Sequence, residues 1–303
     1  MIYMPDIDFE KYLEDNEELK QKVQLPSDFA DKAVERLTTG NHLTGDTLPW
    51  SKTWDKFRFR DGELTIWAGT NGSGKSLVMG MTALFMQNPV VIASMEMLPE
   101  ATLARMVRQA AGVSNPSEPY IRDILHKLDN KVWIFNQVGN VSQNALFGMV
   151  KYAARELGIK HVMIDSLVKC GLGVDDYNAQ KHFVDKLTSL AKDEKVHIHL
   201  VVHMRKLANE NETPDKHSIK GAGEISDLAD NVIIITRKTL NIDPESTEPA
   251  GFIRIAKHRH GEWEGNWGFW FHDESQQWVA NPNAGAIPFP APQQQWSRHD
   301  KNY

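Results

Sequence analysis

Short apolar runs rich in β-branched residues recur along the chain from about residue 57 onward, and segments of mixed polarity separate most of them. Such runs predict buried strands, and the spacing of the segments between them is typical of helices. The predicted strands cover residues 63–69, 90–94, 131–136, 161–165, 197–203 and 231–236. Continuous apolar strands interleaved with helices indicate an α/β fold, with a mostly parallel central sheet flanked by helices.

The clearest predicted helix covers residues 142–158, where Ala145, Met149 and Ala153 fall on one face and Gly158 can end the helix. After residue 250 the pattern changes, and residues 251–260 and 267–280 predict late strands or a hairpin. In a sheet of parallel strands, ligands bind at the carboxyl ends of the strands. We therefore expect the functional residues at that edge.

The first 40 residues predict one or two short helices, the better marked one over residues 27–40 with Ser27 as its cap. The net charge of −6 is concentrated here, because residues 1–40 hold ten acidic and five basic side chains, a net of −5. The remaining 263 residues are near neutral, so the overall charge does not exclude nucleic-acid binding. Residues 41–56, which contain Gly45 and Pro49, are interpreted as a linker into the main domain.

A length of 303 residues with 41% hydrophobic content can fill a large core. The sequence has no apolar run of the roughly 20 residues needed to span a bilayer, and its amino terminus is acidic where a signal peptide would be basic. We therefore expect no membrane association and a cytoplasmic location. Cys170 is the single cysteine, which excludes intrachain disulfides and a zinc ribbon, and it is interpreted as a small buried residue.

The segment GTNGSGKS follows the first predicted strand, precedes a helical stretch and matches the phosphate-loop pattern G-x-x-x-x-G-K-[ST] in full. Its glycines allow backbone N–H groups to surround phosphates, Lys75 supplies a positive charge, and Ser76 can ligate Mg²⁺. The sequence therefore predicts binding of ATP or another NTP together with Mg²⁺. The candidate binding residues are Gly69, Thr70, Asn71, Gly72, Ser73, Gly74, Lys75 and Ser76.

Hydrolysis also requires a carboxylate on the metal side and a group that orients the attacking water. Asp165 ends a predicted strand and is the candidate metal ligand, with an ordinary helix cap as the alternative. Glu96 follows the strand at residues 90–94 and could polarise water, although it has no motif of its own. His203 closes another strand just before Arg205 and Lys206, where it could sense a γ-phosphate or could simply be structural.

The order of the motifs GTNGSGKS, SMEM, HVMID, VVHMRK, IKGAGEISDLAD and IAKHRHGEWEG resembles the RecA-like motor domain of the superfamily four hexameric helicases. This group contains DnaB, Twinkle and the phage primase-helicases, and the resemblance covers roughly residues 45–280. It implies that Glu96 is the catalytic glutamate, that Asp165 is the Mg²⁺ ligand and that His203 is the γ-phosphate sensor.

The resemblance further implies that Lys257 and Arg259 reach the ATP of the adjacent subunit, with Arg259 as an arginine finger. A guanidinium supplied in trans contributes about 10³ to 10⁵ in rate, so a lone protomer would be chemically incomplete. The residues expected to bind DNA in an inward-facing loop are Arg205, Lys206, Lys220, Gly221, Ala222 and Gly223.

The resemblance implies an ATP-dependent replicative DNA helicase that forms a ring of six subunits on single-stranded DNA and unwinds duplex DNA in the 5′ to 3′ direction. We expect an acidic helical linker and subunit-docking segment at residues 1–44, a motor domain at 45–280 and a Pro- and Gln-rich flexible tail at 281–303. Only about 45 residues precede the predicted motor. We therefore expect either that another protein carries out priming or that this is a reduced helicase of the kind a phage encodes, and a separate primase and a separate polymerase are the expected partners.

Two alternatives remain open from the sequence. One is a RecA- or RadA-like recombinase filament, which uses the same core on single-stranded DNA. The other is a nucleotide-switched protein that binds or loads DNA. The basic pair followed by HGEWEG near the carboxyl end favours the helicase.

Overall fold

The computed structural model describes residues 25–39, 44–173, 176–204, 223–238, 248–261 and 263–289. Within these residues the strands form one sheet in the order β3-β2-β4-β5-β1-β6-β7-β8-β9. The strands are β1 (Leu64–Gly69), β2 (Val90–Ser94), β3 (Val132–Ile134), β4 (His161–Asp165), β5 (His197–His203), β6 (Asn231–Arg237), β7 (Gly251–His258), β8 (Gly265–His272) and β9 (Gln277–Val279). The helices are α1 (Ala30–Thr39), α2 (Lys75–Phe85), α3 (Pro99–Ala111), α4 (Glu118–Leu128), α5 (Gln143–Glu156), α6 (Tyr177–Glu194) and α7 (Gly223–Leu228).

The mostly parallel sheet expected from the sequence is confirmed. Strands β1 to β6 pair in parallel, and β7, β8 and β9 extend the sheet beyond β6 as antiparallel strands. Three of the predicted strands, at 90–94, 161–165 and 197–203, have the bounds that the apolar runs indicated. The predicted strand at 131–136 is shorter in the structure, because only residues 132–134 pair with β2.

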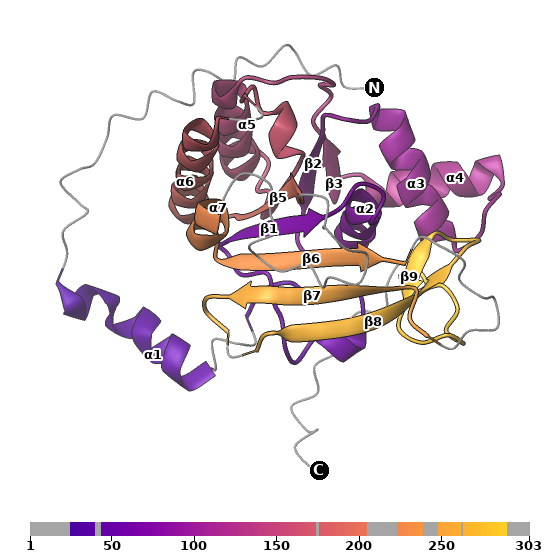
Figure 1. Ribbon diagram of the computed structural model, residues 1–303, viewed down its shortest axis with the longest axis horizontal. Helices are drawn as coiled ribbons and strands as arrows, with labels where there is room; N and C mark the ends of the chain where they lie inside the picture. The colour runs from indigo at the N-terminus through magenta and orange to yellow at the C-terminus, as the bar shows by residue number, and fades with distance from the viewer. Residues whose placement is uncertain are drawn as a thin grey trace.

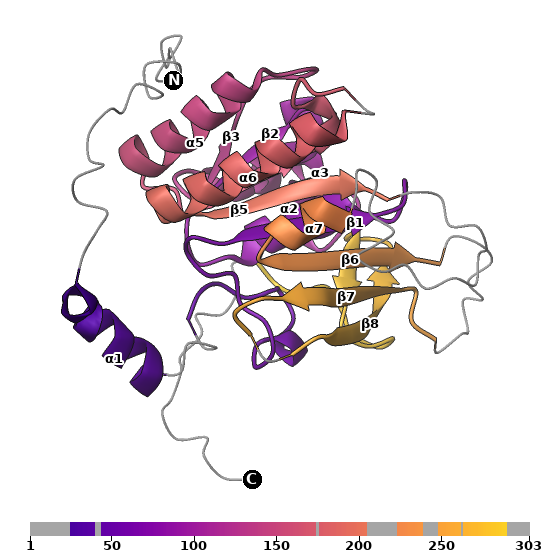
Figure 2. The ribbon, with the colours of Figure 1, turned by 60° about the vertical axis from the view of Figure 1, so that its left-hand side comes forward.

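Helices cover both faces of the sheet (Figure 1, Figure 2). Helices α5, α6 and α7 contribute to one buried apolar cluster, and α2, α3 and α4 contribute to the other on the opposite face. The alternation of side chains along β1 divides the strand between them, with Leu64 and Ile66 in the first cluster and Trp67 in the second. Strands buried on both faces explain why the sequence shows continuous apolar runs.

The predicted helix at 142–158 is α5, and its two ends are marked by specific residues. The Ser142 hydroxyl accepts a hydrogen bond from the Ala145 N–H at 3.2 Å and caps the first turn. Gly158 has a φ of 64°, the left-handed conformation that favours glycine after a helix. Met149 and Ala153 are buried, as the periodicity predicted.

The helix predicted near the amino terminus is present but begins differently. A 3-10 turn, η3 (Pro26–Phe29), leads directly into α1, and Ser27 lies inside that turn instead of capping the helix. Helix α1 lies apart from the sheet in Figure 1, and its apolar side chains Val34 and Leu37 are 57% and 86% exposed. The other predicted helix and Gly40 lie outside the described residues.

The interpretation of residues 41–56 as a linker is wrong for the part that is described. Leu48 and Trp50 are buried in the second apolar cluster, and Trp50 Nε1 donates to the Trp278 carbonyl at 2.5 Å. Large apolar side chains in this segment cover the sheet near β9, so the segment belongs to the core despite its turn-forming residues.

The tail predicted from residue 281 also begins as packed structure. The Ile287 N–H donates to Gln277 Oε1 at 2.7 Å, and the ring of Phe289 lies 6.4 Å from that of Phe85. Residues 281–289 therefore pack against the domain, while residues 290–303 lie outside the described part of the chain.

A chain of buried polar groups joins the amino ends of the parallel strands to residue 46. Trp67 Nε1 donates to His199 Nδ1 at 3.1 Å, and His199 Nε2 lies 3.2 Å from His161 Nδ1. His161 Nε2 then donates to Asp46 Oδ2 at 2.6 Å. Burial raises the pKa of Asp46, but the hydrogen bonds led by the one from His161 outweigh it and lower the pKa to about 2. Burial lowers the pKa of the neighbouring His197 to about 3.

A bulge in β7 changes the direction of its last side chains. Val232 pairs with Lys257 and Ile233 pairs with Ile255, so Ala256 is an extra residue on β7. Ile255 faces the second apolar cluster, and the extra residue turns Lys257 toward α7 on the opposite face. Without the bulge, Lys257 would share the face of Ile255.

Cys170 is buried as the sequence indicated, and burial raises the pKa of its thiol to about 12. Among the described residues, no helix has the length and apolar character needed to cross a membrane.

Candidate nucleotide-binding site

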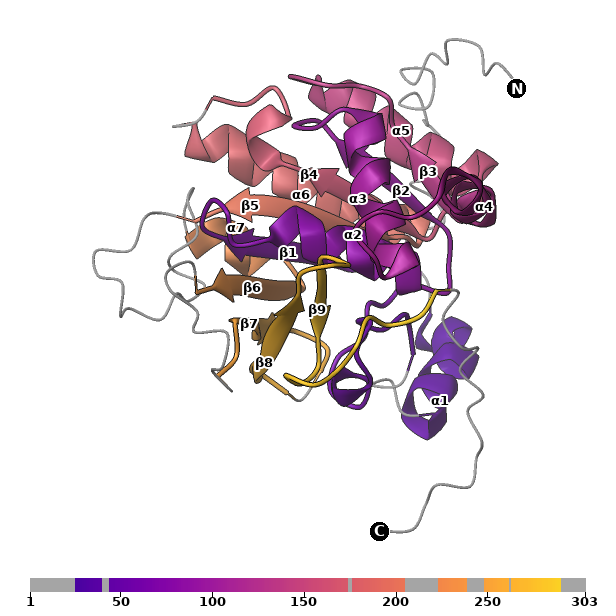
Figure 3. The same ribbon diagram turned by 90° about the vertical axis from the view of Figure 1, so that its right-hand side faces the viewer.

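The segment GTNGSGKS forms a loop between β1 and α2 at the carboxyl end of β1 (Figure 3). Gly72 and Gly74 have φ values of 78° and 91°, which non-glycine residues rarely adopt. A Cβ added to Gly69 would stand 2.5 Å from both the Ile235 carbonyl oxygen and Ser73 Oγ. Glycine at these positions is therefore required by the path of the loop.

The loop presents hydrogen-bond donors and positive charge to one point. Lys75 is buried, and its Nζ donates to the Gly69 and Thr70 carbonyls at 3.0 and 2.9 Å. Burial lowers the pKa of Lys75, although the charges of Asp165 and Glu96 oppose the shift. Ser73 Oγ is buried without a hydrogen-bond partner among the described residues. Together with the amino terminus of α2, these groups fit a bound phosphate chain.

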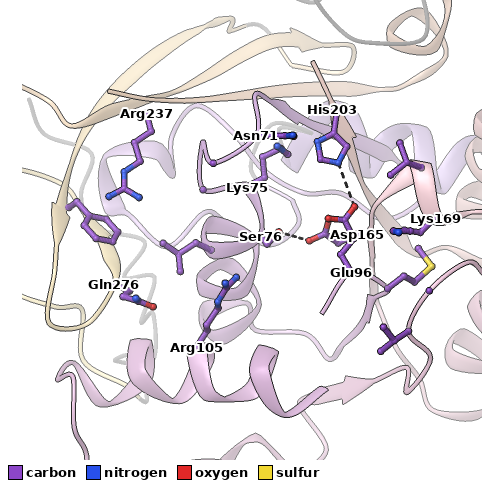
Figure 4. A pocket seen from close by; sticks show the side chains of 18 residues that line it. Asn71, Lys75, Ser76, Glu96, Arg105, Asp165, Lys169, His203, Arg237 and Gln276 are labelled. Carbon is purple, nitrogen blue, oxygen red and sulfur yellow. Dashed lines mark hydrogen bonds and ion pairs between the residues drawn. The ribbon is translucent and has the colours of Figure 1, made fainter. Parts of the chain in front are cut away.

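Ser76 and Asp165 lie together at the start of α2 and the end of β4. Ser76 Oγ donates to Asp165 Oδ2 at 2.5 Å (Figure 4). Burial raises the pKa of Asp165, and the hydrogen bond from Ser76 partly offsets it. Adjacent oxygen ligands of an octahedral Mg²⁺ stand about 2.9 Å apart. The Ser76 and Asp165 oxygens would therefore need to move only slightly further apart for both to ligate the ion. The donor set of one hydroxyl and one carboxylate fits Mg²⁺ held jointly with phosphate oxygens and water.

Within the described residues no cluster of three or more His, Cys, Asp or Glu side chains forms a metal cage.

Glu96 and His203 lie opposite the loop, each just at or beyond the end of a strand. His203 Nε2 is 3.5 Å from Glu96 Oε1, and the Ser166 hydroxyl donates to the same oxygen at 2.5 Å. Burial raises the pKa of Glu96, but the hydrogen bond from Ser166 and the charge of His203 outweigh it, and the pKa is lowered. Glu96 is therefore held as a carboxylate that can accept a proton or polarise water.

These residues line one cavity of about 1000 Å³ (Figure 4). The sequence predictions for the phosphate loop, for Glu96, for Asp165 and for His203 converge on it, as the carboxyl ends of neighbouring strands meet at one edge. The lining residues that come from the predicted set are Asn71, Gly72, Gly74, Lys75, Ser76, Glu96, Asp165 and His203.

A second wall of the cavity was not foreseen from the sequence. The Arg237 guanidinium lies 4.4 Å from the ring centroid of Phe271, and Gln276 stands on the same side. Arg105 projects from α3 into the cavity between Ser76 and Gln276 in Figure 4. No local motif marks these residues, because they come from α3, β6, β8 and the β8–β9 turn and meet only in the folded chain.

Helix α3 fixes this wall against the phosphate-loop helix. Arg108 donates through Nε and Nη2 to the Glu274 and Asp273 carbonyls at 2.8 and 2.7 Å. Gln109 Nε2 donates to the Leu77 carbonyl in α2 at 3.0 Å and to the Gln276 carbonyl at 3.2 Å. The β8–β9 turn is thereby held in place beside the start of α2.

Lys257 and Arg259 do not reach this cavity. They lie at the amino ends of the parallel strands, since His258 pairs with Asn231 and Asn231 pairs with Thr65, four residues before Gly69. Strand spacing and rise place them roughly 15 Å from the phosphate loop of their own chain. Lys257 Nζ donates to the Ser226 carbonyl at 2.9 Å. Arg259 donates to the Asp227 carbonyl at 2.7 Å and to Asp230 Oδ1 at 3.2 Å.

The predicted DNA-binding residues Arg205, Lys206, Lys220, Gly221 and Ala222 lie outside the described residues. Gly223 is the first residue of α7. The basic pair at 257 and 259 therefore contacts the helix that directly follows the predicted DNA-binding segment.

Comparison with known proteins gives both a family and a fold. The family model described as the DnaB-like helicase C-terminal domain matches residues 56–279. The ATPase domain of G40P matches with a TM-score of 0.75 and 18% identity, covering 85% of this chain and 99% of that chain. A structure described as a DnaB-like replicative helicase and its interactions with primase matches with a TM-score of 0.72 and 18% identity, covering 85% of this chain and 67% of that chain. The expected RecA-like fold is confirmed by these structures.

Proposed function

This chain belongs to the family of DnaB-like helicase C-terminal domains, and from that premise we propose how its ATPase chemistry is divided between subunits. Membership makes the chain an ATP-hydrolysing replicative DNA helicase. It also favours the helicase over the recombinase filament and the nucleotide-switched loading protein that the sequence left open. The proposal concerns the residues, the assembly and the partners through which the helicase acts.

The phosphate loop binds the triphosphate of ATP in cis. Lys75 offsets the charge of the phosphates and the N–H groups of residues 69–76 donate hydrogen bonds to them, and Ser76 and Asp165 would hold Mg²⁺. When bound, Mg²⁺ would supply charge stabilisation to the phosphates of the nucleotide. The support for this assignment is the orphaned, buried Ser73 hydroxyl beside the buried Lys75 ammonium, which together fit an anion.

Glu96 polarises the attacking water, and His203 senses the γ-phosphate. Both lie at the carboxyl edge of the sheet facing Lys75 across the cavity, and the lowered pKa of Glu96 keeps it ionised at neutral pH. His203 is the last residue of β5 and precedes the segment that contains the predicted DNA-binding residues. A change at the γ-phosphate would therefore be passed along the chain to DNA.

The second wall of the cavity holds the base and ribose of the nucleotide. The Arg237 guanidinium and the Phe271 ring present flat surfaces on which a base can stack, and Gln276 adds hydrogen-bonding groups. Stacking accepts any base, so this wall supports use of ATP together with other NTPs.

Arg259 and Lys257 complete the site of a neighbouring subunit. The observation that carries this step is their distance from their own phosphate loop, at the opposite end of the parallel strands. A charge placed there can contact a nucleotide only across a subunit interface. The arrangement supports a closed ring, for which we propose six subunits with α1 and the rest of residues 1–44 docking on the neighbour.

The ring encloses single-stranded DNA and moves in the 5′ to 3′ direction. Arg205, Lys206 and Lys220 bind phosphates, and Gly221, Ala222 and Gly223 let the backbone approach them, so binding is independent of sequence and sensitive to salt. A separate primase is a proposed partner, since one of the similar structures is described with primase. A separate polymerase completes the proposed set of partners.

The test is ATP turnover with and without single-stranded DNA, together with strand displacement at a fork. We expect DNA to stimulate turnover many-fold. We expect Lys75→Ala to abolish turnover and displacement, and Glu96→Gln to abolish displacement and leave only a small, measurable residual turnover. Lys127→Ala, which changes an exposed lysine of α4 paired with Asp123, is the matched control and should behave as wild type. Turnover that does not respond to DNA, or a Glu96→Gln variant that hydrolyses ATP at the wild-type rate, would contradict the proposal.

A further inference from the structure

Ser166 lies at the centre of the contacts on the catalytic side of the cavity. It follows Asp165 at the end of β4 and is completely buried. Its hydroxyl donates to Glu96 Oε1 at 2.5 Å and lies 3.5 Å from His203 Nε2. A carboxylate can only accept, so the single hydroxyl proton goes to Glu96 and the oxygen lone pairs are left facing His203.

Glu96 depends on such contacts for its orientation. It lies beyond the end of β2, and its side chain is 36% exposed. Within the described residues, its polar partners are the Ser166 hydroxyl and His203 Nε2. The Ser166 contact is a full ångström shorter than the 3.5 Å contact with His203, so the hydroxyl is the stronger restraint. A carboxylate that polarises water must be held within hydrogen-bond reach of it.

The backbone of Ser166 is itself fixed. Its carbonyl accepts a hydrogen bond from the Lys169 N–H at 2.9 Å, at the start of the 3-10 turn η6 (Leu167–Lys169). Cys170 Sγ approaches the same carbonyl at 3.5 Å. The hydroxyl therefore extends from a rigid, buried position toward a partly exposed glutamate, which is the arrangement that orients a flexible side chain.

We propose that Ser166 is a positioning residue that holds Glu96 in the orientation needed to polarise the attacking water. The proposal rests on the proposed function, in which Glu96 activates water. Ser166 also joins Glu96 to His203, so that the three side chains from the ends of three neighbouring strands form one unit. A movement of His203 would then reach Glu96 through one shared hydroxyl as well as directly.

The experiment measures ATP hydrolysis with DNA in excess, and binding of ADP, for Ser166→Ala, Glu96→Gln and the double variant. We expect Ser166→Ala to lower kcat roughly 10- to 100-fold, with KM and the Kd of ADP within about threefold of wild type. We expect the double variant to be no slower than Glu96→Gln alone, because Ser166 acts only through Glu96. Ser94→Ala is the matched control, since Ser94 is also buried, lies two residues before Glu96 and pairs with Asp165 in the sheet.

Each possible result decides the proposal. An unchanged or raised kcat in Ser166→Ala would overturn it, as would a loss of ADP binding, which would indicate a structural role. Additive effects in the double variant would show that Ser166 acts independently of Glu96 and would also overturn it. If Glu96→Gln itself hydrolyses ATP normally, the proposed role of Glu96 fails first. If Glu96→Gln is inactive and Ser166→Ala is normal, the inference about Ser166 fails alone.

Discussion

Glu96 and Arg105 stand on opposite sides of the same cavity and differ in the polar partners that the protein gives their side chains. Glu96 has two polar partners and a lowered pKa with named causes. Arg105 projects into the cavity beside Ser76 and Leu77, and within the described residues neither a hydrogen bond nor an ion pair to it is found. Its neighbour Arg108, by contrast, is bound to two carbonyls of the β8–β9 turn. A cation facing the start of α2 without a protein anion is suited to a nucleotide phosphate.

We predict that Arg105→Ala raises the Kd of both ATP and ADP by about tenfold while kcat at saturating ATP changes little. Equal weakening of the two nucleotides is expected because the Arg105 side chain stands on the Ser76 side of the cavity in Figure 4, away from Glu96. Fluorescent-nucleotide titration measures both affinities. Arg122→Ala on α4 removes an exposed arginine paired with Glu118 and serves as the control. Unchanged affinities, or a loss confined to ATP, would show that Arg105 does not contact the phosphates shared by the two nucleotides.

At the scale of elements, the sequence predicted the strands well because both faces of the sheet are covered. The apolar runs that became β2, β4 and β5 had clear ends, and polar residues at those ends marked Asp165 and His203. The sequence also marked Lys257 and Arg259 as a basic pair near the end of a late strand. The face that they occupy could not be predicted, because the extra residue Ala256 turns them toward α7 and no sequence signal marks a bulge there.

Other parts of the site were beyond sequence analysis for a different reason. Arg237, Phe271 and Gln276 converge on the cavity only because β7 and β8 extend the sheet as antiparallel strands and return the chain to the start of α2. Ser166 could have been noticed, since it follows the candidate metal ligand directly. The role of Ser166 depends on its hydrogen bond to Glu96, and the sequence does not reveal that contact because the two residues lie 70 positions apart.

The buried histidines at the amino ends of the strands predict a pH dependence of stability. His197 has a pKa of about 3 in the folded protein because it is buried, whereas an unfolded histidine has a pKa of about 6.5. Its stabilising effect is therefore complete above about pH 6.5 and is lost as the pH falls toward 3, since the unfolded chain binds a proton that the native chain does not. His258, with a pKa lowered to about 4 by burial and by the charge of Arg60, acts in the same direction.

We predict that the free energy of unfolding in urea falls between about pH 6.5 and pH 4.5, with each such histidine contributing about 1.4 kcal/mol per pH unit. In His197→Gln, the free energy of unfolding should fall less steeply with decreasing pH, by the contribution of about one proton. This holds even if the variant is less stable than wild type at neutral pH. The control His126→Gln changes an exposed histidine of α4 and should leave the slope as in wild type. An equal slope in His197→Gln and wild type would contradict the assignment of a neutral, buried His197.

At the scale of the whole molecule, the two ends of the parallel strands have separate tasks. The carboxyl ends carry the phosphate loop, Glu96 and Asp165, and the amino-end side of the sheet carries Lys257 and Arg259. The basic pair is held by carbonyls in the last turn of α7, a helix that begins at the end of the predicted DNA-binding segment. Engagement of the pair with a neighbouring nucleotide would compete with these contacts, which gives each subunit interface a physical connection to the DNA-binding segment.

The most direct measurement of this division is the ATPase activity of mixed assemblies. Lys75→Ala subunits have an intact Arg259 but a defective phosphate loop, and Arg259→Ala subunits have the reverse, so each variant alone should be nearly inactive. If Arg259 acts across the interface, mixing the two should restore part of the DNA-stimulated turnover, because some interfaces then pair an intact loop with an intact arginine. Assemblies shown by two affinity tags to contain both variants, yet no more active than the separate variants together, would contradict a site shared between neighbouring subunits.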